Sequence, residues 1–233
     1  MKALVLSSGG VDSTTALGMA IEKYGKENVT ALSISYGQKH DKEIQAAEAV
    51  AAYYGIEQLF LDLAKIFRYS NSSLLKQSTD EIPEESYSKQ IKVTGGEKPV
   101  STYVPFRNGL FLSSAASIAL SKDCGVIYYG AHADDAAGNA YPDTSVEFNN
   151  AIAESIYIGS GKALRVVAPF IDEPKAYVVK VGHEIGVPFE LTWSCYEGHE
   201  KACGVCGTCR DRRRAFAEND LVDPIQYEAD TEE

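Results

Sequence analysis

The sequence predicts an α/β fold, built on one open parallel sheet with helices on both faces and followed by a small C-terminal subregion. Three observations lead to this prediction. Short apolar runs alternate with segments of helical periodicity. A chain of 233 residues has room for one such domain, with a core that needs no disulfides. Four of the five cysteines lie between positions 195 and 209, which sets the last part of the chain apart.

The first sixty residues supply the alternation. The expected order is strand 3–7, helix 11–24, strand 29–36, helix 40–54 and strand 58–63. Gly25 and Gly55 follow the two helices, where glycine commonly ends a helix. Such a β-α-β-α-β order favours a parallel sheet covered by helices on both faces.

Residues 65–103 interrupt this pattern with a polar segment. It contains Pro83, Gly95, Gly96 and Pro99 and has no clear period. Loops of this length in compact domains are usually functional or disordered. The segment is therefore interpreted either as a surface insertion or as a lid over a site, and the sequence favours neither.

The pattern resumes in the second half of the chain. The expected elements are helix 107–121, strand 126–130, helix 146–157, strand 165–168, helix 175–185 and helix 209–218. The first of these helices is apolar almost all round, so we expect it inside the core. Residues 1–190 are assigned to the α/β domain and residues 191–220 to the cysteine-containing subregion. Residues 221–233 form an acidic tail that is expected to be disordered.

Charge and hydropathy limit the classes of partner. The chain has 22 Lys and Arg against 33 Asp and Glu, a net charge of −11. Nucleic-acid binding is therefore disfavoured, because such proteins need a basic surface to neutralise phosphates. The basic cluster of Arg210 and residues 212–214 is interpreted as a solvated face or as a phosphate or subunit contact. No apolar run approaches the ~18 residues of a membrane helix, and the N-terminal run is too short for a signal peptide, so a cytoplasmic location is expected.

A glycine-containing loop, residues 8–13 (SGGVDS), follows the first expected strand. Two glycines allow a sharp turn and a close approach to a ligand, and the next helix directs its free N–H groups at an anion. Ser8 and Ser13 add hydroxyl groups, and Asp12 is expected to help hold Mg²⁺. The Walker and dinucleotide patterns are missing. The alternative is an ordinary strand-to-helix turn, which would leave the flanking Ser and Asp unexplained.

Two more polar segments follow expected strands, namely residues 36–40 (YGQKH) and 130–135 (GAHADD). Ligands of open parallel sheets collect at the carboxyl ends of the strands. If the strands are as expected, these segments and the glycine loop share one crevice. Their common location indicates a nucleotide and a second substrate bound side by side.

The clustered cysteines have the spacing of a metal site. Cys195, Cys203, Cys206 and Cys209 can supply the four thiolates of a structural zinc site. Four thiolates would close the coordination shell, so no metal-bound water is expected. The alternatives are His199 in place of one thiol, an iron–sulfur cluster, or two disulfides. Cys124 stands apart and is interpreted as a small buried apolar residue.

Several single residues have two interpretations each. Arg107 opens an apolar helix and needs an anionic partner, which is either a substrate group or an internal Asp. Lys175 starts another helix and either reaches a phosphate or is solvated. Asp134, Asp135 and Asp143 either bind Mg²⁺ or a base edge, or act as turn and cap residues.

These motifs together resemble a known family. The loop in segment 7–15 (SSGGVDSTT) resembles that of the pyrophosphate-loop ATPases, whose fold is that of the Rossmann-like adenine nucleotide alpha hydrolases. Within that superfamily the chain resembles the 7-cyano-7-deazaguanine synthases of the queuosine pathway. The resemblance runs through segments 36–40, 104–113 (VPFRNGLFLS), 130–135, 141–143 (YPD), 193–196 (WSCY) and the cysteine spacing. It covers nearly the whole chain and is weakest at residues 65–100 and after residue 218.

Two positions depart from the family pattern. Many members have Gly where Phe106 stands and Cys where Thr144 stands. The second difference argues against a catalytic thiol at position 144. Neither change affects the glycine loop or the four cysteines.

The resemblance implies a cytoplasmic, homodimeric ligase that converts 7-carboxy-7-deazaguanine and ammonia to the nitrile at the expense of ATP and Mg²⁺. It implies catalytic parts for Asp12, Ser13, Arg107 and Lys175. The ATP-binding residues would be Ser7, Ser8, Gly9, Gly10, Val11, Asp12, Ser13, Thr14, Thr15, Ala16 and Leu17. The substrate-binding residues would be Gln38, His40, Arg107, Asp134, Asp135, Tyr141 and Asp143. It also implies one structural Zn²⁺ on the four cysteines, and it leaves open whether AMP or ADP is formed.

Two other functions remain to be weighed. A tRNA-thiolating enzyme of the same superfamily would need a redox-active or sulfur-carrying cysteine pair and a basic surface. A non-catalytic zinc-ribbon regulator would leave the glycine loop and the three strand-end segments without a purpose. The synthase is the favoured hypothesis.

Overall fold

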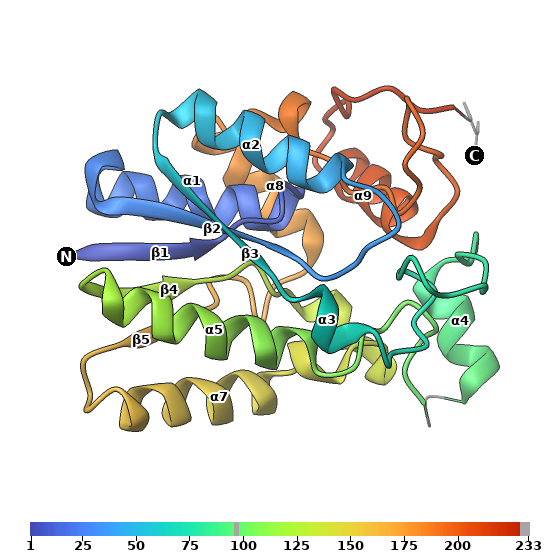
Figure 1. The fold of residues 1–233 in the computed structure, drawn as a ribbon. Coiled ribbons are helices and arrows are strands. Elements are labelled where there is room, and N and C mark those ends of the chain that lie inside the picture. Colours follow the sequence, from blue (N-terminus) through green and yellow to red (C-terminus); the bar gives the residue numbers. More distant parts are fainter. Residues whose placement is uncertain (96–97, 229–233) are drawn as a thin grey trace.

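Five parallel strands form the centre of the computed structural model, which describes residues 1–95 and 98–228 (Figure 1). Their order across the sheet is β3-β2-β1-β4-β5, and every neighbouring pair is parallel. The strands are β1 (Lys2–Leu6), β2 (Val29–Ser35), β3 (Glu57–Asp62), β4 (Cys124–Tyr128) and β5 (Arg165–Val167). The predicted fold class is confirmed.

Helices cover both faces of the sheet (Figure 1). On one face, α5 (Arg107–Ser121) and α7 (Val146–Gly159) pack over a core that includes Leu4 and Ile127. On the other face, α1 (Val11–Tyr24) and α2 (Lys42–Tyr54) cover a core that includes Val5. Leu4 and Val5 face opposite layers because successive side chains of a strand alternate. Burial of both faces explains why the central strands β1 and β4 are largely apolar.

Two further helices extend the second layer. Residues of α1 share an apolar cluster with α8 (Lys175–Glu184) and α9 (Gly207–Ala217). The long helices and strands begin and end within a few residues of their predicted limits. Helix α5 is expected inside the core. Its inner side does lie there, but its outer side does not, since Leu120 is 42% exposed.

The polar segment 65–103 contains more structure than its composition indicates. Its helices are α3 (Ala64–Phe67) and α4 (Tyr87–Thr94), and Phe67, Leu75 and Ile82 are buried. The remaining short elements of the described chain are α6 (Ala133–Ala136) and 3₁₀ turns at Lys26–Asn28, Ala137–Asn139, Pro142–Thr144 and Phe189–Leu191. None of the helices in residues 1–95 and 98–228 has both the length and the apolar character needed to cross a membrane.

The C-terminal segment corrects one expectation. Residues 221–228 do not form a disordered tail but pack on the cysteine-containing subregion, with Ile225 and Tyr227 beside its apolar cluster. The cause is Arg212, which is fully buried and forms a bidentate ion pair with Asp223 at 2.7 and 2.9 Å. A buried guanidinium requires such a partner. Residues 229–233 of the predicted tail lie outside the described residues.

The departure at Phe106 carries backbone strain. Its φ of 57° lies in the left-handed region, which disfavours every residue except glycine, and its ring packs on Phe148. We expect Phe106→Gly to be more stable than Phe106→Ala by about 0.5–1 kcal/mol, because both variants lose the ring but only Ala keeps the strain. Urea unfolding of the two variants measures this difference. Equal stabilities, or a more stable Ala variant, would contradict it.

Candidate active site

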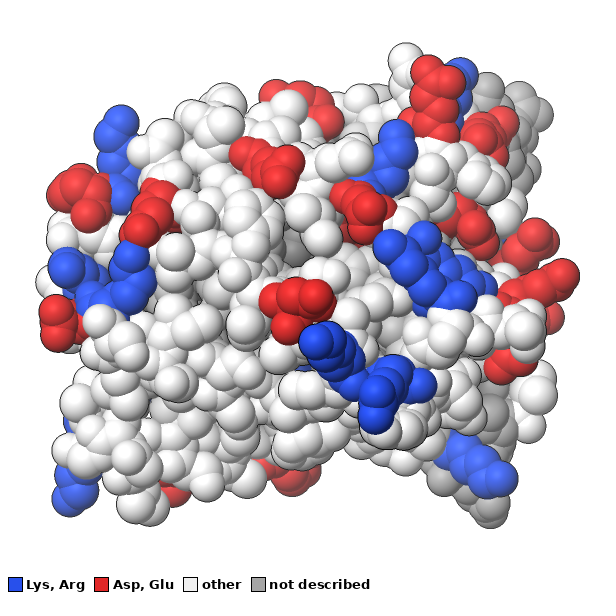
Figure 2. All heavy atoms as spheres, viewed as in Figure 1, with Lys and Arg blue, Asp and Glu red and all other residues white. Residues whose placement is uncertain are grey.

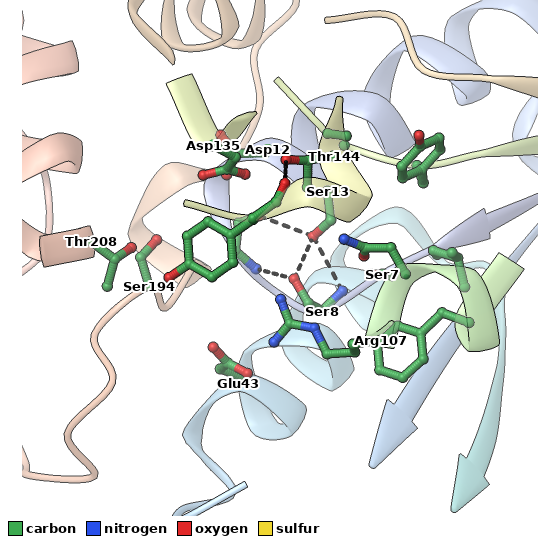
Figure 3. A pocket seen from close by; sticks show the side chains of 18 of the residues that line it. Ser7, Ser8, Asp12, Ser13, Glu43, Arg107, Asp135, Thr144, Ser194 and Thr208 are labelled. Carbon is green, nitrogen blue, oxygen red and sulfur yellow. Dashed lines mark hydrogen bonds between the residues drawn. The ribbon is translucent and has the colours of Figure 1, made fainter. Parts of the chain in front are cut away.

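The main pocket of the described chain lies at the carboxyl ends of β1, β2 and β4 (Figure 3). Its lining includes residues of the glycine loop, of segment 36–40 and of segment 130–135. The predicted common crevice is therefore present. Its other walls come from α2, α5 and α9, and α4 of the polar segment adds Tyr87.

The glycine loop is held by its own serines. The Ser8 amide donates to Ser13 Oγ at 3.2 Å, and the two side-chain oxygens are 3.0 Å apart. Gly9 has a φ of +82°, and a Cβ there would lie 2.5 Å from the Glu43 carbonyl oxygen. Glycine is thus required at this position, because the loop turns against the backbone of α2.

A buried ion pair lies behind the loop. Lys175 Nζ is 2.8 Å from Asp12 Oδ2, and His132 Nε2 is 3.7 Å from the same oxygen. Burial by itself would raise the pKa of Asp12, but Lys175 and His132 outweigh it and hold the pKa below its usual value. Lys175 therefore lies inside the pocket, and the solvated alternative is wrong.

Several polar atoms near this pair lack partners. Among the described residues, the buried atoms without a hydrogen bond include Ser7 Oγ, Asp12 Oδ1, Thr14 Oγ1 and His132 Nδ1. Buried polar atoms are usually satisfied. Asp12 Oδ1 has the chemistry of a Mg²⁺ ligand, so the site fits a cation bound with phosphate oxygens.

Two more carboxylates line the pocket beside this pair. Asp135 Oδ2 is 3.5 Å from His132 Nε2, and Asp211 Oδ1 is 3.1 Å from Arg214. Burial raises the pKa of Asp211. Each of these acids therefore has a basic side chain close by.

On the other side of the pocket, Arg107 reaches in from α5 and Glu43 from α2 (Figure 3). The guanidinium donates to Tyr36 Oη at 3.3 Å and lies over the same ring. Burial would lower the pKa of Arg107, but Tyr36, Tyr196 and Asp143 raise it overall, so the group stays charged. Burial raises the pKa of Glu43 to about 7, and Arg107 opposes this shift only in part.

Three tyrosines join separate parts of the chain at the pocket wall. Tyr196 Oη is 2.6 Å from Tyr87 Oη and 3.2 Å from Tyr141 Oη, and Tyr141 is 2.6 Å from Thr102 Oγ1. Burial raises the pKa of Tyr87 and Tyr196 well above the usual value. Tyr87 and Thr102 belong to segment 65–103, so this segment forms part of the wall.

The four clustered cysteines are buried, and their Sγ atoms lie within 4.8 Å of one another. Cys203 Sγ and Cys209 Sγ are 4.0 Å apart, close to the ~3.8 Å expected for thiolates on a tetrahedral metal. Backbone amides of Glu197 and Cys203 donate to Cys195 Sγ, as suits a thiolate. The cluster could hold a metal ion. His199 is exposed and pairs with Glu228 instead.

Not all predicted site residues line the pocket. The lining includes Ser7, Ser8, Gly10, Asp12, Ser13, Gln38, Arg107, Asp135, Tyr141 and Lys175. The predicted loop and helix residues outside the lining are Gly9, Val11, Thr14, Thr15, Ala16 and Leu17, and all six are buried beneath the loop or inside α1.

Three of the predicted substrate-binding residues lie outside the lining and have partners within the chain. His40 Nδ1 accepts from the Lys42 amide at 3.2 Å. Asp134 accepts from the Lys175 amide, and Asp143 accepts from the Asn108 amide, at the first turns of α8 and α5. A carboxylate that meets the free amides of a helix N-terminus is a common cap, which explains these positions.

Sequence reasoning missed other lining residues, which include Glu43, Tyr87, Tyr129, Ser194, Tyr196, Thr208 and Asp211. Two signals were available. Glu43 follows segment 36–40 at the start of a helix, and the last four residues flank the cysteines or come soon after them in sequence. Tyr87 has no local signal, because its neighbours form a polar segment.

Comparison with known proteins finds the same family in a family model and in whole-length relatives. A family model described as "Queuosine biosynthesis protein QueC" matches residues 2–220. A protein named 7-cyano-7-deazaguanine synthase from Oceanobacillus iheyensis is 42% identical over 229 residues, which cover 97% of this chain and 98% of that protein. Another of that name from Pseudoalteromonas atlantica is 39% identical over 227 residues, or 97% and 99% of the two chains.

A solved structure of the U34-tRNA thiolase NcsA from Methanococcus maripaludis also aligns, over 94% of this chain and 66% of that chain. The TM-score is 0.48 and the identity is 16%. A likeness this low bears neither on the fold nor on the reaction.

The raised pKa of Glu43 predicts a pH-dependent stability. Its ordinary value is 4.5 and its value in the folded chain is about 7, so the folded state holds the proton more tightly between these values. Stability from this group is therefore present below about pH 4.5 and is lost as the pH rises through 7. We expect Glu43→Gln to gain thermal stability relative to the native chain at pH 8, with a smaller difference at pH 5.

Calorimetric unfolding at the two pH values measures this effect. Glu48→Gln on the exposed side of the same helix is the matched control and should follow the native chain. Parallel stability curves for the native chain and Glu43→Gln would contradict the prediction.

Proposed function

Because the chain belongs to the QueC family of queuosine biosynthesis proteins, we propose that it is a 7-cyano-7-deazaguanine synthase. It would join 7-carboxy-7-deazaguanine and ammonia into the nitrile at the expense of ATP. The observation that carries this proposal is the agreement of whole-length relatives of that name with a pocket that combines a glycine loop at a helix N-terminus and a half-buried Arg107. The protein would thus be an enzyme whose substrates are all small molecules.

The chemistry explains the need for ATP. A carboxylate is a poor electrophile, because its leaving group would be oxide. If a carboxylate oxygen attacks the α-phosphorus, pyrophosphate leaves and an acyl adenylate forms. Ammonia then displaces AMP and gives the amide with loss of a proton. A second activation at the amide oxygen lets that oxygen leave with the nucleotide, and loss of two protons from nitrogen gives the nitrile.

The roles of the pocket residues follow from their positions. The loop amides and the hydroxyl groups of Ser8 and Ser13 would hold phosphate oxygens at the N-terminus of α1. Asp12 would hold Mg²⁺, which supplies charge neutralisation at the phosphates when bound. Lys175, held by Asp12, would donate to a phosphate oxygen, and Arg107 would pair with the substrate carboxylate.

We assign the metal of the cysteine cluster as one structural Zn²⁺. Four buried thiols support this assignment, because four thiolates close a tetrahedral shell. Ser194, Tyr196 and Thr208 are direct sequence neighbours of Cys195 and Cys209, and all three line the pocket. The metal would thus fix one wall of the active site and take no part in the chemistry.

Thiolation of tRNA is not favoured. The four cysteines of the C-terminal subregion all belong to one buried cluster, so they offer no separate redox pair. The net charge is −11, and basic and acidic side chains are interspersed over the face shown in Figure 2. The homodimer and the cytoplasmic location remain predictions.

Metal content tests the zinc assignment. We expect about one zinc and no iron per purified chain by elemental analysis. Cys206→Ser should lose the metal and lower the thermal midpoint, because one thiolate of the closed shell is missing. Cys124→Ser, a buried cysteine outside the cluster, is the control and should keep its zinc. Iron in place of zinc would overturn the assignment.

Turnover tests the function itself. The native chain with ATP, Mg²⁺, ammonium and 7-carboxy-7-deazaguanine should give the nitrile, measured by mass spectrometry, and the same spectra distinguish AMP from ADP. Lys175→Gln should turn over about 100-fold more slowly, because a phosphate donor is lost. Lys180→Gln on the exposed side of α8 should match the native rate. An unchanged base and intact ATP, with zinc bound, would overturn the proposal.

A further inference from the structure

We infer that Glu43 recognises the donor edge of the substrate base. Its carboxylate would accept hydrogen bonds from the ring N–H and the exocyclic amino group of a guanine-type heterocycle. This inference rests on the proposed function and names a specificity-determining residue for it.

The position of Glu43 is fixed by the glycine loop. Glu43 lies in the first turn of α2, and its carbonyl oxygen is in the close contact that requires glycine at position 9. The side chain points from α2 into the main pocket, on the side of Arg107 (Figure 3). A shift of this helix turn toward the loop would bring the two backbones into collision, so the carboxylate starts from a closely packed part of the fold.

Glu43 differs from the other pocket carboxylates in its partners. Asp12 pairs with Lys175, Asp135 lies near His132, and Asp211 pairs with Arg214. In the part of the chain that the structure describes, the Glu43 carboxylate has no hydrogen bond or ion pair of its own. Glu43 is half-buried, and desolvation raises the pKa of its carboxyl group to about 7.

Arg107 has the complementary property. Its guanidinium donates to the neutral hydroxyl of Tyr36, and no carboxylate of the described residues lies within ion-pair distance. The pocket therefore contains a half-buried carboxyl group and a half-buried guanidinium that form no ion pair with each other. Such charges are costly unless a ligand pairs with both.

The proposed substrate carries both complementary groups. Its carboxylate is attached to the five-membered ring, and its ring N–H and amino group lie at the far side of the six-membered ring. Two adjacent N–H donors match the two oxygens of a carboxylate, and Arg107 matches the substrate carboxylate. Adenine has no such pair of donors, because its ring nitrogen at that edge is an acceptor. Glu43 would thus also discriminate between the deazaguanine and the adenine of ATP, which both enter this pocket.

A ribose contact is the rival explanation, because carboxylates also bind ribose hydroxyl groups. The experiment measures binding by calorimetry for three ligands: a non-hydrolysable ATP analogue, 7-carboxy-7-deazaguanine, and the same base without the amino group. The proteins are the native chain, Glu43→Gln, and the control Glu48→Gln. The amide keeps the size of the carboxyl but places an NH₂ group toward the donor edge.

We expect Glu43→Gln to weaken binding of the full base by about 10- to 100-fold, as for the loss of a charged hydrogen-bond partner. The base without the amino group should bind the native chain at least about 10-fold more weakly than the full base, and this discrimination should nearly vanish in Glu43→Gln. The ATP analogue should bind all three proteins equally.

The following results would overturn the inference. If Glu43→Gln weakens both bases by the same factor, Glu43 does not contact the amino group. If it weakens only the ATP analogue, Glu43 serves the ribose. A native chain that forms nitrile while Glu43→Gln keeps full discrimination would sink this inference alone. A native chain that neither binds the base nor forms nitrile would sink the proposed function as well.

Discussion

The position of β1 between β2 and β4 is the constraint on which the rest of the structure depends. Because all three strands are parallel, the segments that follow them leave the sheet at the same end, where the carboxyl ends of the strands lie. The chain after β1 must turn sharply into α1, and it does so against the backbone of α2. The N-terminus of α1, the glycine loop and the first turn of α2 therefore all lie at this end of the sheet. A binding pocket at this place follows from the topology.

Charge placement divides this pocket into two parts. Near the loop, each acid has a basic neighbour, and Lys175 holds Asp12 ionised within a buried region. Toward the aromatic wall, Glu43 and Arg107 are half-buried, and neither forms an ion pair within residues 1–95 and 98–228. The first part suits a ligand that carries its own cation and phosphates. The second suits a ligand with an acidic group and a donor edge. Two substrates of different chemistry can therefore be told apart within one cavity.

The last quarter of the chain completes the pocket and is itself held by a few strong contacts. Cys195 and Cys209 of the cysteine cluster directly adjoin the pocket-lining residues Tyr196 and Thr208 in sequence, so whatever binds the thiols also sets this wall. Arg212, which is buried and belongs to α9, donates a hydrogen bond to Thr192 and pairs with Asp223. This pair fastens the segment 221–228 over the cluster. The tyrosine contacts through Tyr196 then join this subregion to the polar segment 65–103.

What the sequence alone determined is local and periodic. Alternating apolar runs placed the strands and long helices, since their burial pattern repeats within a few residues. The cysteine spacing likewise indicates a metal site without reference to any distant contact. Lys175 shows the limit of this approach: the sequence allowed a solvated or a buried lysine, and only the distance to Asp12 decided between them.

Tertiary structure decided the identity of the pocket residues, because lining a cavity is a property of side chains that are distant in sequence. Asp134 and Asp143 carry the chemistry of ligands, yet their carboxylates cap helices. Tyr87 lies in a segment without periodicity, yet it reaches the wall through Tyr196. The tail 221–233 is acidic, which predicts disorder, but its first part is held in place because the buried Arg212 pairs with Asp223. Sequence patterns describe what each residue can do, whereas packing decides which neighbour it meets.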